Sequence, residues 1–337
     1  MIPIMDQQQR SLEYLRISVT DRCNFRCSYC MPAHIFGQNY PFIPPDELLS
    51  FDEITRVAKV LIQLGVRKIR LTGGEPLVRK NIEHLITRLV AIDGIDEVTM
   101  TTNGLLLAKR AYDLKQAGLS RLNVSLDSLD PDVFRRMSGN RAEVEAVLEG
   151  IQVAESAGFH PIKINSVVQR GINDHTLVDV ALYFRERGHI VRFIEFMDAG
   201  TANGWHKDHV ITADEMITLL NRYVPLEPLA PNSAGEVVRR YRYADGLGEV
   251  GFITSVSQPF CGSCNRLRLA ADGKLYTCLF TSRGHDLRAL LRTSASNEAI
   301  EETIADIWRR RTDRYSEERA AGVVAEADRV EMFHIGG

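Results

Sequence analysis

"TDRCNFRCSYCMP", residues 20–32, places Cys23, Cys27 and Cys30 within eight residues of the chain. Thiolates this close together are typical ligands of a metal ion or a cluster. A closed zinc site needs four protein ligands, and only three are evident here, although His34 lies near enough to be considered. An iron–sulfur cluster is bound by thiolates and can leave one iron open. The spacing therefore favours an iron–sulfur cluster, with zinc as the alternative.

The other three cysteines, Cys261, Cys264 and Cys278, lie far along the chain in "QPFCGSCNRLRLAADGKLYTCLF". A disulfide framework suits a short secreted chain and not one of this length. Zinc is a stronger alternative here, because a CxxC pair with one more cysteine and a distant histidine is an ordinary zinc arrangement. Arg266 and Arg268 follow the CxxC pair directly. They favour a second open cluster beside an anionic substrate.

Composition restricts the class of protein. The chain has 337 residues, of which 45% are hydrophobic and 25% charged, as in ordinary globular proteins. A net charge of -3 argues against a general nucleic-acid or membrane binder. The first residues lack the apolar core of a signal peptide, and no apolar run reaches transmembrane length. We therefore expect a cytoplasmic protein, with no nucleic-acid or membrane partner.

The first two thirds of the chain alternate between short β-rich runs and amphipathic stretches. Ser50 with Glu53 forms the pattern of a capping box, and Gly65 and Gly158 are typical helix ends. Such alternation predicts a parallel sheet covered by helices. The expected strands lie in 14–20, 67–73, 96–104, 120–128, 161–169 and 191–198.

After residue 200 the alternation of β-rich and amphipathic stretches gives way to a different pattern. Residues 210–223 predict one more helix, and 236–257 and 266–280 predict antiparallel strands, the second turning at Asp272-Gly273. Two helical stretches follow, at 285–292 and 296–311. We expect a smaller C-terminal module that carries the second cysteine set.

Cations recur on the predicted strands at a spacing of two, which directs both members of a pair to one face. Barrel interiors usually take branched apolar side chains, so several inward cations need an anion to neutralise them. Outward, solvated faces are the alternative for any single pair. The number of cations favours a polyanion pocket, and there is no GxxxxGK[ST] motif to bind a nucleotide otherwise. The cations are Arg16, Lys68, Arg70, Lys163, Arg192, Arg266 and Arg268.

"CNFRCSYC" together with "TGGEP" (72–76) resembles the radical S-adenosylmethionine (SAM) superfamily. The resemblance implies a [4Fe–4S] cluster bound by Cys23, Cys27 and Cys30, with SAM chelating the fourth iron. Three further strand ends, "TTNG", "NVSLDS" and "EFMD", support a site at the C-terminal mouth of a partial barrel. By the same resemblance, the SAM contacts are Tyr29, Gly74, Ser125 and Met197.

The wider pattern, including "KIRLTGGEPLVRK", "CNRLR" and the terminal "HIGG", resembles the family of GTP 3′,8-cyclases. These lyases perform the first step of molybdenum cofactor biosynthesis. The resemblance implies that a 5′-deoxyadenosyl radical from SAM takes hydrogen from C3′ of GTP, and that the C3′ radical then bonds to C8. Reduction of the resulting aminyl-type radical by a further electron, with a proton, gives (8S)-3′,8-cyclo-7,8-dihydroguanosine 5′-triphosphate. A second [4Fe–4S] cluster, bound by Cys261, Cys264 and Cys278, would hold the guanine. The implied GTP contacts are Thr101 and the seven cations above, with Gly336 and Gly337 reaching into the active site.

The expected architecture is α/β: an N-terminal extension (1–12), a partial (β/α)6 TIM-type barrel (13–210), a C-terminal α+β module that carries the second Fe–S cluster and closes the barrel (211–320), and a tail (321–337). The implied partners are an electron donor of the flavodoxin or ferredoxin type and cyclic pyranopterin monophosphate synthase, for a monomer or homodimer. Two alternatives stay open. One is a peptide-modifying radical SAM enzyme with an auxiliary cluster, and the other is a non-catalytic zinc or Fe–S module.

Overall fold

The computed structural model describes residues 3–232, 235–323 and 329–337. Within them, twelve strands form one sheet in the order β12-β11-β10-β1-β2-β3-β4-β5-β6-β9-β8-β7. The six strands from β1 to β6 pair in parallel, as the alternating pattern predicts. Their bounds are β1 Tyr14–Ser18, β2 Lys68–Thr72, β3 Glu97–Thr102, β4 Arg121–Ser125, β5 Lys163–Val168 and β6 Ile190–Glu195.

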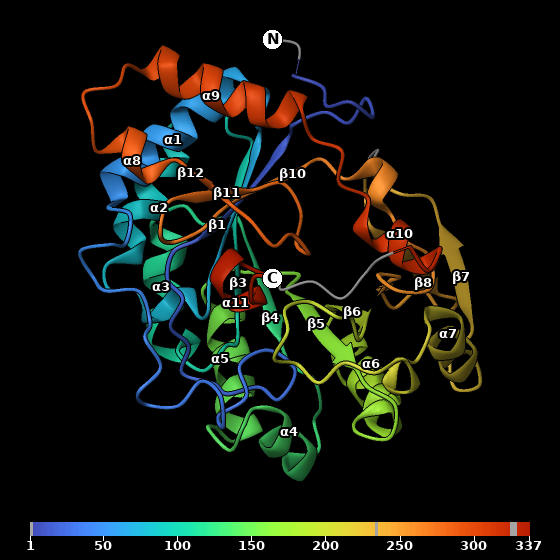
Figure 1. Cartoon of the computed structure of the whole chain (residues 1–337). Coiled ribbons are helices and arrows are strands. Elements are labelled where there is room, and N and C mark those ends of the chain that lie inside the picture. The colour runs from blue at the N-terminus through green and yellow to red at the C-terminus, as the bar shows by residue number, and fades with distance from the viewer. Residues whose placement is uncertain (1–2, 233–234, 324–328) are drawn as a thin grey trace.

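Helices follow the outer side of these strands, which together curve into a partial barrel (Figure 1). The predicted capping box of α1 is present, since Ser50 and Glu53 exchange side-chain to backbone hydrogen bonds. The α/β fold class predicted from the alternation is confirmed. The helices of this part are α1 Phe51–Gln63, α2 Ile82–Val90, α3 Leu107–Gln116, α4 Pro131–Met137, α5 Val144–Ser156 and α6 Leu177–Arg185.

The C-terminal strands continue the barrel sheet at both of its edges. In the register, Val191 of β6 lies beside Val250 of β9, and Arg16 of β1 lies beside Arg268 of β10, both in parallel. The predicted antiparallel pairs also form, β8 with β9 and β10 with β11. The domain boundaries stay predictions, because one sheet runs across them. The remaining elements are α7 Ala213–Asn221, β7 Leu226–Leu229, β8 Val238–Tyr243, β9 Glu249–Ile253, β10 Arg266–Leu269, β11 Lys274–Tyr276, β12 His285–Asp286, α8 Arg288–Leu291, α9 Asn297–Arg309, α10 Tyr315–Ala320 and α11 Met332–Ile335.

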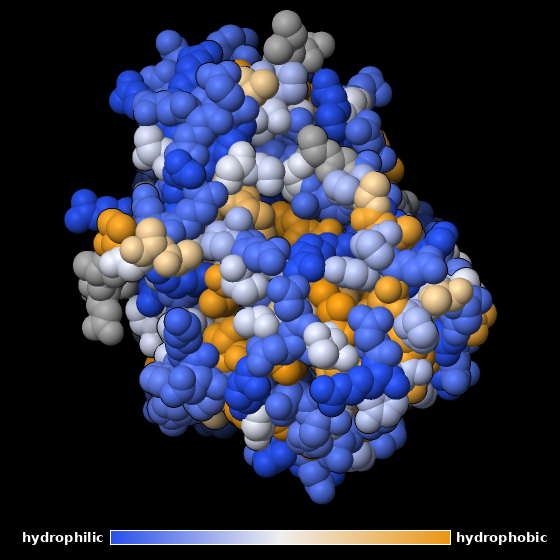
Figure 2. All heavy atoms as spheres, turned by 90° about the vertical axis from the view of Figure 1, so that its right-hand side faces the viewer, coloured by the Kyte–Doolittle hydropathy of each residue, from blue (hydrophilic) through white to orange (hydrophobic). Residues whose placement is uncertain are grey.

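Two C-terminal helices pack against the barrel domain, α9 against α1 and α11 against β1. Figure 1 shows α9 alongside α1, and the C-terminus with α11 in front of the central strands, where α11 contacts β1. Charged and polar side chains dominate the face that carries α7 and β7, with apolar residues in the recesses between them (Figure 2). In the part of the chain that the structure describes, no helix has the length and apolar character needed to cross a bilayer.

Candidate active site

A cavity of about 730 Å³ lies inside the partial barrel, with walls from β1 to β6, β9 and β10. It brings together nearly every site residue expected from the sequence. Gly336 is not among the lining residues but contacts one of them. The predicted residues that line the cavity are Arg16, Cys23, Cys27, Tyr29, Cys30, Lys68, Arg70, Gly74, Thr101, Ser125, Lys163, Arg192, Met197, Cys261, Cys264, Arg266, Arg268, Cys278 and Gly337.

The first cysteine group follows β1, where the chain packs against the Gly73-Gly74 turn after β2. The Gly74 N–H donates to the Thr20 carbonyl at 2.8 Å. A Cβ at Gly74 would lie 2.3 Å from the Arg22 carbonyl oxygen, and Gly73 has a φ of 145°. Only glycine permits so close a backbone approach. The turn is therefore part of the framework that holds the loop with Cys23, Cys27 and Cys30.

The first three thiols are free and lie close together in a poorly solvated place. Burial raises the pKa of Cys23 to about 12, and it raises the pKa of Cys27 and Cys30 as well. The Phe25 N–H donates to Cys23 Sγ at 3.3 Å, and the Asn103 amide lies 3.8 Å from the same sulfur. The cationic iron–sulfur core of a bound cluster would supply the positive charge that such thiols need to ionise. These residues fit a three-cysteine cluster site.

The half-buried Tyr29 and the buried Asp127 form a pair next to this group. The Tyr29 hydroxyl donates to Asp127 Oδ2 at 2.8 Å, and the Val167 N–H donates to Asp127 Oδ1 at 2.9 Å. Burial raises the pKa of Asp127 to about 6, although both hydrogen bonds oppose it. The tyrosine expected to contact SAM is therefore held in a fixed position by the end of β4.

The second cysteine group has a different electrostatic setting. Burial acts against ionisation of Cys264, but Arg266 and Arg311 outweigh it and lower the pKa of this thiol to about 6. Burial raises the pKa of Cys278 to about 12. The three thiols are free and line the same cavity as the first group. They fit a second three-cysteine cluster, with one ligand already disposed to be a thiolate.

The strand register aligns the cations into a row. Arg16 lies opposite both Arg70 and Arg268 in the neighbouring strands, and Arg192 lies opposite Asn165. Arg16 Nε and Arg192 Nε are buried and have no hydrogen-bond partner among the described residues. Arg192 Nη2 donates to Asn123 Oδ1 at 2.8 Å, so the Arg192 guanidinium is only partly satisfied. Buried guanidinium nitrogens without a partner are costly, so the row is suited to a polyanion.

Mutual repulsion and burial disfavour the charged forms of these groups. Burial, followed by Arg192, lowers the pKa of Lys163 to about 7. Burial, followed by Arg70, lowers the pKa of Arg192 to about 9, and burial with Arg266 lowers that of Arg268 to about 10. A bound anion would relieve all three effects.

The C-terminal tail reaches this row. Arg268 contacts the carbonyl oxygens of Ile335 and Gly336, and a Cβ at Gly336 would lie 2.0 Å from Thr72 Oγ1. The tail is fastened further back, where the Glu331 carboxylate accepts hydrogen bonds from the Thr201 N–H at 3.0 Å and its hydroxyl at 2.7 Å. Gly336 therefore occupies a place that a larger residue could not.

Among the lining residues that sequence reasoning did not single out are Tyr14 and Arg121. Arg70 lies 5.4 Å from the Tyr14 ring centre, and Arg70 and Arg16 lower the pKa of Tyr14 although burial opposes them. Tyr14 lies two residues before Arg16 on the same strand, so the same alternation could have identified it.

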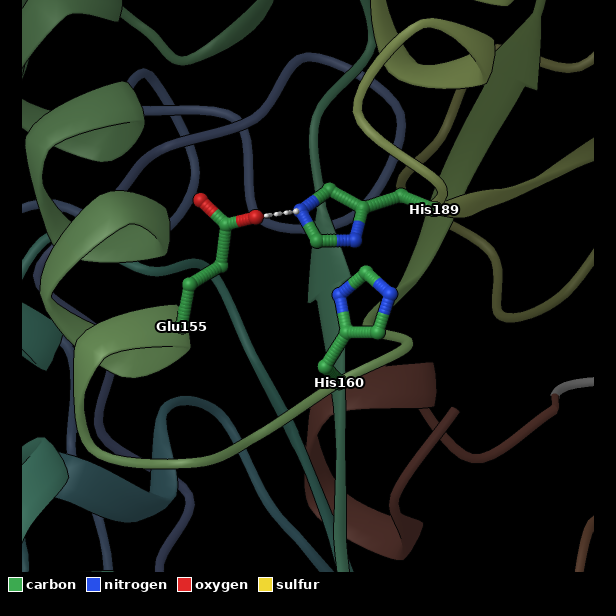
Figure 3. Close-up of side chains that lie close together, drawn as sticks. All are labelled: Glu155, His160 and His189. Atoms are coloured by element: carbon green, nitrogen blue, oxygen red, sulfur yellow. Dashed lines mark ion pairs between the residues drawn. The ribbon is translucent and has the colours of Figure 1, made fainter.

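Glu155, His160 and His189 form a second polar cluster, where β5 and β6 begin (Figure 3). Their ligand atoms all lie within 4.8 Å of one another, and His189 Nε2 is 3.1 Å from Glu155 Oε1. The Ile162 N–H donates to His189 Nδ1 at 3.3 Å, so the neutral ring carries its proton on Nε2. A metal would need the lone pair of that nitrogen, with Nδ1 as donor. The geometry therefore favours a neutral histidine beside a carboxylate, not a metal site.

Comparison with known proteins gives two family matches and many close relatives. The profile of the radical SAM superfamily matches residues 17–184, and that of the Molybdenum Cofactor Synthesis C family matches residues 189–317. A GTP 3′,8-cyclase of Acidothermus cellulolyticus is 50% identical over 99% of this chain and 94% of its own length. Those of Xanthomonas campestris and Staphylococcus aureus are 49% and 46% identical, again over 99% of this chain and 98% and 99% of theirs. Among solved structures, Streptococcus suis SuiB bound to S-adenosylmethionine has a TM-score of 0.62 at 15% identity, covering 94% of this chain and 69% of SuiB, which shows a shared fold.

Proposed function

The chain belongs to the family of GTP 3′,8-cyclases within the radical SAM superfamily, and we infer that it cyclises GTP with two [4Fe–4S] clusters and SAM. One observation carries this inference for the chain itself. Two groups of three free cysteines open onto a single cavity, and a row of cations lies in the same cavity. Neither a single-cluster enzyme nor a zinc module accounts for that combination.

Cys23, Cys27 and Cys30 would hold the cluster that binds SAM, and Tyr29, Gly74, Ser125 and Met197 would contact the SAM molecule. When bound, the cluster and SAM supply the radical that removes hydrogen from C3′ of GTP. The protein contributes position and exclusion of water. All seven residues line one cavity, which supports this assignment.

Cys261, Cys264 and Cys278 would hold the second cluster, whose open iron would take the guanine. The triphosphate would then lie along the row of cations, together with Thr101. Arginine forks match phosphate oxygens in pairs, so the row can fix a triphosphate in one orientation. The alignment of Arg16 with Arg70 and Arg268 supports this placement. Gly336 and Gly337 would close the site from above Thr72.

The pathway implies further partners. We propose a flavodoxin- or ferredoxin-type electron donor and cyclic pyranopterin monophosphate synthase as the consumer of the product. A reducing cytoplasm suits the six free thiols.

Anaerobic incubation of the reconstituted protein with SAM, a reductant and GTP tests the function. We expect about eight irons per chain and GTP-dependent formation of both 5′-deoxyadenosine and a cyclised nucleotide. Formation of 5′-deoxyadenosine without GTP and without a cyclised nucleotide would favour a peptide-modifying enzyme. Zinc in place of iron would contradict the proposed function.

GTP affinity is expected to fall as the pH rises, through Lys163. Without GTP, the Lys163 amine has a pKa of about 7, and a bound triphosphate favours its charged form. Above about pH 7, binding of GTP is therefore coupled to uptake of a proton. Between about pH 7.5 and about pH 9 the phosphates are already ionised and do not contribute to the change. We expect Kd, measured anaerobically by calorimetry, to rise about tenfold or more over this range.

Lys163→Met is the control for this pH dependence. It should bind GTP more weakly at about pH 7.5 and show little further loss at about pH 9. An equal pH dependence in the wild type and in Lys163→Met would place the titrating group elsewhere.

A further inference from the structure

The segment before β1 forms a tight turn beside the loop that carries Cys261 and Cys264. The Asp6 N–H donates to the Arg10 carbonyl at 3.1 Å, and Asp6 Oδ1 accepts from the Arg10 N–H at 3.0 Å. This turn directs the Arg10 side chain inward, and Arg10 lines the cavity. The N-terminal segment therefore takes part in the architecture around the second cysteine group.

Asp6, Arg10 and Arg311 form a fully buried triad, each with no more than 1% of its side chain exposed. Asp6 Oδ2 lies 2.6 Å from Arg10 Nε and 3.4 Å from Arg311 Nη1. Burying ionic groups costs several kcal/mol per ion unless they are well paired. Removing one member of such a triad leaves a buried charge without its partner, so the three side chains hold one another in place.

Both arginines of the triad donate to the carbonyls of second-group cysteines. Arg10 Nη1 lies 3.0 Å from the Cys261 carbonyl oxygen, and Arg311 Nη1 lies 2.7 Å from that of Cys264. The indole N–H of Trp308 donates to the Arg10 carbonyl at 3.1 Å, and the Arg311 guanidinium lies 4.6 Å from the Trp308 ring centre. The loop between the two cysteines is thus held by Arg10 from the N-terminal region and by Arg311 from the C-terminal region.

Further charged groups surround this loop. The Glu317 carboxylate accepts a hydrogen bond from the Gly262 N–H at 3.1 Å, and Arg268 lies near Cys264 and Cys278. Besides the triad, Asp313 lies 3.4 Å from Arg311 Nε at the partly exposed rim, and Arg266 lies on the other side of Cys264. Arg10 Nη2 is buried and has no hydrogen-bond partner among the described residues. A cluster with three thiolate ligands is an anion that this unpaired N–H could serve. In an environment of low dielectric constant, a single nearby charge strongly changes the electrostatic potential at the cluster site.

We propose that Asp6, Arg10 and Arg311 are positioning residues for the second cluster, which hold the Cys261–Cys264 loop and set the reduction potential of the cluster. The inference rests on the proposed function, since it requires a cluster at this site. Hydrogen bonds and local charge are established means by which proteins tune such clusters.

The test uses the full chain in a Cys23→Ser, Cys27→Ser, Cys30→Ser background, so that only the second cluster is observed. The iron content is measured, and the midpoint potential is determined by redox titration followed by electron paramagnetic resonance. Arg311→Gln removes a positive charge, so its midpoint should shift to more negative values. Asp6→Asn removes a negative charge with little change in shape, so its midpoint should shift to more positive values.

Opposite shifts in the two variants would support the proposal, because a loosened loop alone has no reason to give them. Arg310→Gln is the matched control. Its side chain is 80% exposed and pairs only with Asp306 among the described residues, so its midpoint should match the background. Arg311→Lys keeps the charge, so its midpoint should stay near the background even if iron binding weakens.

Three outcomes would count against the proposal. Unchanged midpoints in both variants would overturn it, as would shifts in the same direction. If Arg311→Gln loses its iron, the other two variants decide. A positive shift in Asp6→Asn with no shift in Arg311→Lys supports the proposal, and an unchanged midpoint in Asp6→Asn overturns it. A background protein with far fewer than about four irons per chain would overturn the proposed function itself, and the inference with it.

Discussion

Replacing Cys27 with serine is expected to abolish formation of both 5′-deoxyadenosine and the cyclised nucleotide. Cys27 is half-buried within the first group, beside Cys23 and Cys30, and serine cannot act as a thiolate ligand. Without the first cluster there is no site for reductive cleavage of SAM. The measurement is anaerobic chromatography of both products after reconstitution, together with iron content. About half the iron of the wild type should remain, at the second site.

Cys278→Ser is the matched variant in the second group. It should keep the first cluster and cleave some SAM, yet form no cyclised nucleotide, because the proposed anchor of the guanine is lost. A split between the two variants would assign separate tasks to the two cysteine groups. Equal loss of SAM cleavage in both variants would contradict that assignment, as would cyclisation by either of them.

Gly336→Ala is expected to lower the cyclisation rate by about a hundredfold or more while leaving the fold and iron content intact. A Cβ at Gly336 would lie 2.0 Å from Thr72 Oγ1, within the barrel wall, and the residue has a φ of 74°. An L-residue is strained at that φ, and the overlap with Thr72 leaves no room for adjustment. The tail must therefore leave its place, and Arg268 loses its contact with the Gly336 carbonyl.

Gly337→Ala is the control for Gly336→Ala. Its Cβ would meet only the flexible end of Met332, at 2.7 Å, which can move aside. We expect a much smaller fall in rate. Circular dichroism, iron content and the two product yields are measured for both variants. Full activity in Gly336→Ala would show that the tail has no role in the reaction, and deleting both glycines should match the effect of Gly336→Ala.

The sequence predicted the parallel barrel strands because their signal is local. Each run of β-branched residues is short, and helix ends are marked by nearby residues, such as the capping box at Ser50. The cysteine spacing is equally local, since Cys23, Cys27 and Cys30 lie in one loop. Their chemistry could be inferred before any tertiary contact was known.

The edges of the sheet could not be predicted in this way. Residues 236–257 and 266–280 have the alternation of antiparallel hairpins, which they form, but β9 also pairs in parallel with β6, and β10 with β1. Alternation specifies a strand and not its distant neighbour. The triad of Asp6, Arg10 and Arg311 was missed for the same reason, because its members are separated by almost the whole chain.

The sequence by itself determined the chemistry of this protein: two incomplete sets of thiolates, a SAM-type motif, and cations at every second position of several strands. Tertiary structure decided the rest, namely that these parts share one cavity, that Arg16 lies between Arg70 and Arg268, and that the last two glycines reach that row. This division reflects how far apart in the sequence the interacting residues lie. Ligand type and strand periodicity are encoded by adjacent residues, whereas the meeting of distant segments depends on how the whole sheet pairs and packs.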